Sequence, residues 1–518
     1  MIIIFHNRKK VTKIFDFEKN QELSYIDESI QRTLFRIAME HNEKSIGWCH
    51  DQLEKYIGIE LWQSIFHHDL IMASYATSKT HVISSAVGYV EDSTYLNVKY
   101  DIPYPTWLMS SDIGGISAAA LLQFEKLSIH NLSFDLFLNY LAKQGLKQGL
   151  FCYSEPRLLV RDFSKIDKIL QIGLFSFVKN QYRLRWIFIL FFNYLVYEKR
   201  LRFWSLFKSF IKPVLSKDII DFTKIKVNST KNQEQLNTTY DVLIPTLGRA
   251  EVLKDVLLDL KQHSILPHKV IIVEQNAAPN SETELSYIYD QEWPFEIDHT
   301  FTHQLGACNA RNIALSKISS SWVFLADDDI RLTNTLIENA FKFIEQYGVS
   351  ALNMASLRKD EKLTQTFPIQ WYAFSTNSSF VRSSVIQDIT FGMEHEFGFG
   401  EDSDFGMKLR NTGIDIIFYP NSEILHLKAP VGGFRVKIDL PWDNEEIQPK
   451  PSPMVMAHRY KHTTKQQLLG YKTILFVKFF RVQGNKNPFS YILRMQKRWK
   501  RSLFWAKHLI DKYRPNGV

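Results

Sequence analysis

The 518-residue chain has few cysteines and no apolar run long enough to cross a bilayer. Cys49, Cys152 and Cys308 form no CxxC pair, which argues against a disulfide framework or a zinc site and favours a reducing compartment. The longest apolar stretch, 186–197, is shorter than the roughly 20 residues that a membrane-spanning helix needs. The opening MIIIFHNRKK lacks the longer apolar region and cleavage site of a signal peptide, so it predicts a first strand. We therefore expect a cytoplasmic protein without a transmembrane helix.

General disorder is excluded by the composition, which is 45% hydrophobic and 14% aromatic. The chain is too long for one ordinary core, so two or three domains are expected. Its formal net charge of +8 predicts an anionic partner but does not say which one. Nucleic acid, anionic lipid and a nucleotide diphosphate all remain open at this point.

A polar segment, 223–240, is the best candidate for a linker between domains. Behind it, strand-like and helix-like segments alternate at 240–249, 250–263, 268–276, 308–318 and 322–329. Such alternation predicts an α/β domain over 241–445, with a mixed, mainly parallel sheet flanked by helices. In such sheets ligands bind at the carboxyl ends of the strands.

Several residues, most of them polar, lie at that edge of the predicted sheet. They are Pro245, Thr246 and Arg249 after the first strand, Glu274 and Asn276 after the second, and Asp327, Asp328 and Asp329 after the third. An acidic loop by itself is common. Three carboxylates that end a buried strand repel one another, however, and a bound Mg²⁺ or Mn²⁺ would relieve that cost. The cation could in turn neutralise a diphosphate.

A second acidic cluster, Glu401, Asp402 and Asp404, precedes an amphipathic helix. Carboxylates in the first turn of a helix are stabilised by its dipole, so capping is one explanation of this cluster. The other makes Asp402 a general base, because an ionised carboxylate can accept the proton of an attacking hydroxyl.

His426 follows an apolar, strand-like run, and a basic loop with Lys428 and Arg435 comes after it. A lone histidine in such a place is either a structural hydrogen-bonding residue or, beside an acidic cluster, a metal ligand. The basic loop is either an ordinary surface loop or a lid that closes over phosphates.

The front half, 1–222, predicts a second α/β domain. The segment 106–122 parallels 371–386, and 137–159 parallels 405–426 with a two-residue insertion. This suggests a divergent, non-catalytic copy of the same fold, in which Ser133 and Phe134 stand opposite Glu401 and Asp402. An unrelated α/β domain is the alternative.

Two segments combine aromatic residues with Lys and Arg: 186–210, and the C-terminal region 446–518, for which we expect helices. Such stretches suit the surface of an anionic membrane, which would place the chain on the inner face of the plasma membrane. Alternatively, their apolar sides pack on the domains and the cations are merely solvated. Nucleic acid is the less favoured partner, because no nucleic-acid-binding motif accompanies the charge.

Over about 240–440 the chain resembles the family 2 glycosyltransferases of the GT-A fold, a Rossmann-like fold. The matching elements are VLIPTLGR (242–249), VIIVEQN (270–276), GACNARN (306–312), ADDD (326–329) and GEDSDFG (400–406). Two departures stand out. The second strand ends in Glu-Gln-Asn instead of Asp-Asp-Gly-Ser, and the QxxRW motif of the processive polymerases was not found.

The resemblance implies roles for individual residues. Glu274 would meet the base or ribose of a nucleotide, Arg311 the diphosphate, and Asp327 the ribose, with Asp328 beside it on the donor side. Asp329, with Asp327 and His426, would ligate Mn²⁺ or Mg²⁺. Asp402, beside Glu401, would be the catalytic base. Trp371, Lys428 and Arg435 are expected on the acceptor side or in a lid.

The resemblance thus implies an inverting, metal-dependent glycosyltransferase. It would move a sugar from a nucleotide-diphosphate sugar to a glycan or lipid-linked acceptor, with cell-surface polysaccharide as the expected product. Two alternatives stay open: a sugar-nucleotide pyrophosphorylase, whose Gly-rich N-terminal loop is absent, and a non-catalytic nucleotide-sugar-binding scaffold.

Overall fold

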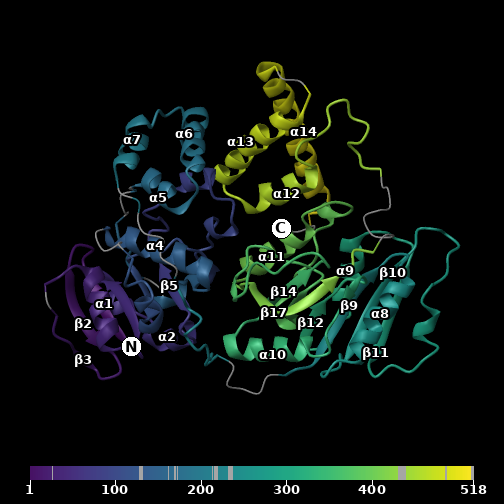
Figure 1. The fold of residues 1–518 in the computed structure, drawn as a ribbon, viewed down its shortest axis with the longest axis horizontal. Helices are drawn as coiled ribbons and strands as arrows, with labels where there is room; N and C mark the ends of the chain where they lie inside the picture. The colour runs from purple at the N-terminus through teal and green to yellow at the C-terminus, as the bar shows by residue number, and fades with distance from the viewer. Residues whose placement is uncertain are drawn as a thin grey trace. The chain divides into compact units, whose positions relative to one another are not determined.

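The computed structural model describes residues 1–25, 27–127, 132–160, 163–167, 171, 173–212, 214, 220–231, 237–429, 439–484 and 487–514 (Figure 1). The chain forms two compact units. Unit 1 comprises 1–233, 346–348 and 464–474, and unit 2 comprises 234–345, 349–463 and 475–518. The division after residue 233 falls inside the polar segment 223–240.

Unit 2 contains a mixed nine-stranded sheet. Its strands are β9 (Tyr240–Thr246), β10 (Lys269–Gln275), β11 (Glu296–Thr302), β12 (Trp322–Leu325), β13 (Ile330–Arg331), β14 (Ala351–Leu357), β15 (Ile369–Gln370), β16 (Ser379–Arg382) and β17 (Ile417–His426). Their order is β11-β10-β9-β12-β16-β14-β17-β13, with β15 also paired to β17. The first four strands in this order run parallel to one another. The sequence predicts three of these strands, β9, β10 and β12, but not β11, and the mixed α/β fold is confirmed.

Helices connect the parallel strands, as the alternation in the sequence predicts. They are α8 (Ala250–Lys261) and α9 (Ala307–Leu315), followed by α10 (Leu336–Tyr347) and α11 (Glu401–Asn411). Helix α8 buries Leu253, Val256, Leu257 and Leu260, which is the spacing of a helix with one face on a core. The strands ending at Thr246 and Leu325 are neighbours and run in the same direction, so their carboxyl ends meet at one edge.

The C-terminal region is helical, as predicted, with α12 (Pro453–His462), α13 (Lys465–Val482) and α14 (Pro488–Lys512). Helices α12 and α14 pack against each other. Ser452 caps α12 and Asn487 caps α14 through their side-chain oxygens. None of the helices that the structure describes combines the length and hydropathy needed to cross a bilayer.

Unit 1 is a second α/β domain, again as predicted. Its strands are β1 (Ile2–His6), β2 (Val11–Asp16), β3 (Gln21–Glu22), β4 (Ser45–His50), β5 (Ile71–Tyr75), β6 (Tyr104–Pro105), β7 (Ile113–Ser117) and β8 (Phe151–Ser154). They form one sheet in the order β3-β2-β1-β4-β7-β5-β8-β6. Its helices are α1 (Ile30–Glu40), α2 (Ile59–Ile65), α3 (Ala118–Leu122), α4 (Phe134–Gly145), α5 (Leu174–Gln181), α6 (Arg185–Glu198) and α7 (Phe203–Ile211).

The two sheets share a five-strand pattern. In unit 1 the neighbours β1-β4-β7-β5-β8 pair parallel, antiparallel, antiparallel and parallel. In unit 2 the neighbours β9-β12-β16-β14-β17 pair in the same sequence of directions. The sheets differ beyond the first of these strands: β10 is parallel to β9, whereas β2 folds back antiparallel on β1.

Candidate active site

A pocket of about 680 Å³ opens in unit 2 at the carboxyl ends of β9 and β12. Many of the site residues predicted from the sequence line it. They are Pro245, Thr246, Arg249, Arg311, Asp327, Asp328, Asp329, Glu401, His426 and Lys428. Residues that are more than 180 positions apart in the chain thus meet at the sheet edge where the strand–helix alternation predicts a ligand site.

Both carboxylate oxygens of Asp328 accept hydrogen bonds from side chains. Its Oδ1 accepts a hydrogen bond from Arg249 at 2.6 Å, and its Oδ2 accepts one from the Thr246 hydroxyl at 2.7 Å. Burial raises the pKa of Asp328 to about 6, although the charge of Arg249 opposes this shift. Asp328 therefore ties the end of β12 to the end of β9 and the start of α8.

The other two carboxylates pair with different cationic side chains. Arg311 donates to Asp327 at 3.1 Å, while His426 Nε2 lies 3.4 Å from Asp329 Oδ1. The second oxygen of Asp329 accepts the backbone N–H of Ala429 at 2.9 Å. The hydrogen bond to Asp329 raises the pKa of His426. Arg249 also lies 3.3 Å from the second oxygen of Asp329, so each member of the acidic cluster has a basic side chain beside it and Arg249 serves two of them.

Arg311 has spare hydrogen-bonding capacity. Its side chain is buried, and its Nε and one terminal nitrogen find no partner among the described residues. Unsatisfied donors on a buried guanidinium cost free energy unless an acceptor fills the space beside them. Since Arg311 lines the pocket, these two nitrogens fit an anion such as a diphosphate.

Asp327, Asp329 and His426 are the pocket residues whose chemistry suits a divalent cation. His426 Nε2 and Asp329 Oδ1 lie 3.4 Å apart and Asp327 is partly exposed, but the three side chains do not form one compact set of ligand atoms in this structure. Carboxylate oxygens with one imidazole nitrogen suit Mn²⁺ or Mg²⁺, the first better because it accepts nitrogen readily. These three residues would hold the metal.

Glu401 and Asp402 begin α11 directly after Gly400, whose φ of 109° is one that glycine adopts without strain. Asp402 Oδ1 accepts a hydrogen bond from the Thr376 hydroxyl at 2.8 Å, and Glu401 lines the pocket. Burial, and then the charge of Asp402, raises the pKa of Glu401 to about 7. Burial also raises the pKa of Asp402, against the opposing charge of Arg311. Two carboxylates with raised pKa values side by side favour proton transfer at this position.

Sequence reasoning missed residues 395–398 on the opposite wall of the pocket. The carboxylate of Glu396 accepts the backbone N–H groups of Cys308 at 2.7 Å and Asn309 at 3.1 Å, and so caps α9. A Cβ at Gly306 would lie 1.6 Å from a Glu396 oxygen, so only glycine fits there. The glycine of the GACNARN element was therefore a usable signal for a close approach, although not for its partner.

Some predicted residues do not line the pocket. The oxygens of Glu274 accept hydrogen bonds from Thr283 and the backbone N–H of Glu284, and His299 lies 3.0 Å away. Asn276 accepts the backbone N–H of residue 278, and the Trp371 ring stacks on that of residue 418. Neither these three residues nor Asp402 belongs to the pocket wall. Arg435 lies outside the described residues.

Asp404, two positions after Asp402, anchors α11 to α12. Its carboxylate is fully buried and accepts hydrogen bonds from Lys461 and His462, each at 2.7 Å, with Lys408 at 3.0 Å. Lys461 also bonds Glu394 at 2.6 Å. Asp404, Glu394 and His462 belong to side-chain groups compact enough to hold a metal ion. The two lysines already balance the two carboxylates, so we assign the cluster a structural role.

Residues 241–400, which contain most of the pocket, match the family described as Glycosyl transferase family 2. This segment is therefore similar to that family. No curated protein is similar enough to the chain to count as a match.

Some solved structures have weak overall similarity to the chain. S. aureus TarS 1–349, solved in complex with UDP-GlcNAc, is 17% identical over 53% of this chain and 81% of its own, with a TM-score of 0.37. A mannosyltransferase from Pyrobaculum calidifontis, solved with GDP-Man and Mn²⁺, is 14% identical over 55% of this chain and 79% of its own, with a TM-score of 0.31.

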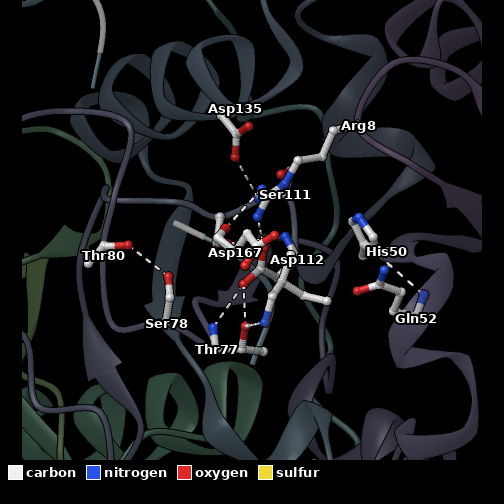
Figure 2. Close-up of polar contacts among 12 residues, drawn as sticks. Arg8, His50, Gln52, Thr77, Ser78, Thr80, Ser111, Asp112, Asp135 and Asp167 are labelled. Atoms are coloured by element: carbon white, nitrogen blue, oxygen red, sulfur yellow. Dashed lines mark hydrogen bonds and ion pairs between the residues drawn. The ribbon is translucent and has the colours of Figure 1, made fainter. Parts of the chain in front are cut away.

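Unit 1 has a polar cluster at the strand ends that correspond, by sheet order, to those of the glycosyltransferase domain (Figure 2). Asp112 is buried there between Arg8, which donates to it at 2.8 Å, and Thr77, whose N–H and hydroxyl both donate to its second oxygen. Its carboxylate is thus satisfied by donors of unit 1 itself.

Asp135 lies in the first turn of α4 and accepts the backbone N–H of Ser111 at 3.1 Å (Figure 2). It is the second residue of its helix, as Asp402 is the second residue of α11. Counted from the first residue of each helix, Asp135 stands opposite Asp402, whereas the alignment made from the sequence places Phe134 there.

Replacing Lys461 with Ala should lower the free energy of unfolding of the glycosyltransferase domain by about 2 kcal/mol, because buried Asp404 and Glu394 lose a shared ammonium group. Urea denaturation followed by tryptophan fluorescence measures the change. Lys342→Ala is the control: it breaks an exposed pair with Glu338 and should cost no more than about 0.5 kcal/mol. Equal losses in the two variants would contradict the assigned role.

Proposed function

We propose that this chain transfers a sugar from a nucleotide-diphosphate sugar to a hydroxyl group of a glycan or lipid-linked acceptor, in a metal-dependent reaction that inverts the anomeric carbon. The observation that carries the proposal is that the acidic cluster 327–329 and Glu401 line one pocket, most of which lies in the segment that matches family 2. A donor held by the first group would present its sugar to the second.

The donor side combines the cation with fixed positive charge. Asp327, Asp329 and His426 would hold Mn²⁺ or Mg²⁺, which when bound offsets the negative charge that develops on the leaving nucleotide diphosphate. Arg311 supplies unsatisfied N–H donors toward the same group, and Lys428 lines the pocket beside it. Asp328 and Arg249, which pair with each other, support this edge from within.

On the acceptor side, a carboxylate removes the proton of the attacking hydroxyl. The acceptor oxygen forms a bond to the anomeric carbon as the bond from that carbon to the diphosphate oxygen breaks, and the nucleotide diphosphate leaves. Because attack and departure occur on opposite faces, the configuration inverts. We assign the base to Asp402, which Thr376 orients through a hydrogen bond at 2.8 Å.

Glu401 is the second candidate for the base, since it lines the pocket whereas Asp402 does not. The two carboxylates are adjacent on the first turn of α11, and both have pKa values raised by burial. The pair would therefore share one proton over part of the working pH range, and Asp402 is the member with a fixed orientation.

Unit 1 is proposed to be a divergent, non-catalytic copy of the glycosyltransferase domain. Two observations support this: the common five-strand pattern, and a carboxylate, Asp112, that is neutralised internally by Arg8 instead of being available to a cation. The parallel strand β10 also has no parallel counterpart in unit 1, where the β2 hairpin stands in its place.

The acceptor and the location follow from the same proposal. We place the chain in the cytoplasm, peripheral on the inner face of the plasma membrane, where it would extend a cell-surface polysaccharide precursor. Assays with a panel of nucleotide sugars and Mn²⁺ distinguish this function from its two alternatives. A pyrophosphorylase would consume diphosphate to form a nucleoside triphosphate, and a scaffold would bind the donor without turnover.

Asp402→Asn should abolish sugar transfer and leave donor binding unchanged, because the amide cannot accept the proton. Glu401→Gln, as the matched variant, should retain transfer at a reduced rate. Initial rates and donor titrations by calorimetry measure both properties. If Glu401→Gln lost more transfer activity than Asp402→Asn, the base would be Glu401. Substantial residual turnover in a variant that carries both substitutions would show that unit 1 is catalytic.

Asp329→Ala should weaken Mn²⁺-dependent donor binding by at least about tenfold, because a carboxylate ligand is lost. Calorimetric titration of the nucleoside diphosphate with and without Mn²⁺ measures this effect. Asp298→Ala removes a partly exposed carboxylate paired with Lys317 and serves as the control. Unchanged dependence on the metal in Asp329→Ala would contradict the ligand assignment.

Thr376→Val should shift the acidic limb of the pH–rate profile to higher pH. The Thr376 hydroxyl holds the pKa of Asp402 down, so its removal raises that pKa further, and a base acts only when ionised. Thr376→Ser keeps the hydroxyl and should leave the limb in place. The measurement is kcat/KM as a function of pH, and identical profiles in the two variants would refute the role of Thr376.

A further inference from the structure

Helix α7 of unit 1 exposes the side chains that a globular helix normally buries. The one residue of α7 that is buried is Ser209. Its large apolar side chains instead face solvent, with Trp204 71% and Ile211 70% exposed, together with Phe203, Phe207 and Phe210. A helix of a soluble domain places its apolar face on the core, so this face requires a cover that unit 1 does not supply.

Helix α6 continues the exposed apolar surface. Phe188, Phe192 and Leu195 are exposed and spaced as one helical face, and the Phe188 ring lies 6.2 Å from that of Phe210 on α7. The opposite face of α6 is held inside unit 1, where Asn193 accepts a hydrogen bond from Thr473 at 2.6 Å. That inward face also buries Ile187, Leu190 and Tyr194, so α6 packs one apolar face on unit 1 and leaves a second one exposed.

We name the exposed face of these two helices the α6–α7 surface. It consists of Phe188, Phe192, Leu195, Phe203, Trp204, Phe207, Phe210 and Ile211. Hydrogen bonds hold the C-terminal end of α7 in place, since Lys179 donates to the carbonyl oxygens of Ser209 and Lys212 at 2.8 and 2.7 Å. These bonds satisfy carbonyl groups at the C-terminus of α7 that would otherwise need water.

Positive charge surrounds the α6–α7 surface. Between 183 and 212 the chain has seven basic residues and one acid, Glu198. All seven basic residues are exposed: Arg183, Arg185, Lys199, Arg200, Arg202, Lys208 and Lys212. An apolar aromatic face bordered by Lys and Arg complements an anionic bilayer, whose acyl boundary accepts the rings and whose headgroups attract the cations.

Other partners would fit the α6–α7 surface less well than a membrane. A second copy would bring the same seven cations against these, and like charges across an interface oppose association. The segment is also too short to span the bilayer, and none of the described helices can cross it, so the surface would lie in the interface plane.

We propose that the α6–α7 surface docks unit 1 onto an anionic membrane, with Trp204, Phe207 and Ile211 inserted at the headgroup boundary. The proposal builds on the peripheral location given under the proposed function, and it assigns unit 1 a task that needs no catalysis. Unit 1 would hold the glycosyltransferase domain close to lipid-linked acceptors and thereby raise their effective concentration.

The test is co-sedimentation of the full chain with vesicles of phosphatidylcholine alone or with phosphatidylglycerol added. The wild-type chain should bind the phosphatidylglycerol vesicles and be released by salt. The triple variant Trp204→Ser, Phe207→Ser, Ile211→Ser should partition at least about tenfold less. Because all three side chains are exposed, the variant should keep its far-ultraviolet circular dichroism.

A matched control lies in α14, which is also basic and exposes Phe489 and Leu493. Phe489→Ser with Leu493→Ser should leave vesicle binding unchanged, and loss of binding there with retention in the triple variant would overturn the proposal. Self-association of the wild-type chain that the triple substitution abolishes, without vesicle binding, would identify a protein interface instead and also overturn it.

Failure of docking and failure of the proposed transfer reaction are distinguishable. The triple variant should hydrolyse the donor, or transfer its sugar to a soluble acceptor, at the wild-type rate. Asp402→Asn should bind vesicles as the wild-type chain does while losing turnover. A triple variant that bound vesicles normally would refute the proposal whatever its activity.

Discussion

Three adjacent carboxylates at the end of one strand, two of them buried, are stable together only if basic side chains compensate them, and this constraint organises the pocket. Asp327, Asp328 and Asp329 are compensated by residues from three different elements. The partners are Arg311 of α9, Arg249 at the start of α8 and His426 at the end of β17. The pairing therefore joins the ends of the central strands to the helices around them, and it leaves two of the three carboxylates beside a histidine and a partly unsatisfied arginine. The same charges that would make the edge unstable alone make it suited to a cation and a diphosphate.

The helix that carries the proposed base is held independently of the pocket. Asp404 is buried among Lys461, Lys408 and His462, so that the first turn of α11 is anchored to α12. Asp402, half a turn away, is left to interact with Thr376. Rigid support on one side and a single hydrogen bond on the other position a carboxylate without consuming its basicity, which is the arrangement that proton transfer requires.

The two units use one strand pattern for different purposes. In unit 2 the sheet extends through the parallel strands β10 and β11, and the acidic edge opens onto a pocket. In unit 1 a hairpin stands beside the first strand, and the buried Asp112 is neutralised by Arg8 (Figure 2). What unit 1 presents instead is an exposed apolar surface bordered by positive charge, a feature of its helices α6 and α7.

The sequence by itself determined most elements of the parallel sheet in unit 2 and the edge at which the pocket opens. Strand and helix periodicity are local properties, so the strands ending at Thr246 and Leu325, and the acids that follow, could be placed without coordinates. Only the tertiary structure decided which side chains act together. Thr376 and Glu396 lie in irregular segments with no periodic signal. The sequence does not distinguish Asp328 from Asp327 and Asp329, and only the structure shows its pairing with Arg249. The spacing of residues along the chain determines on which face of a strand or helix each side chain lies. Contacts between loops depend instead on how distant segments of the chain pack together.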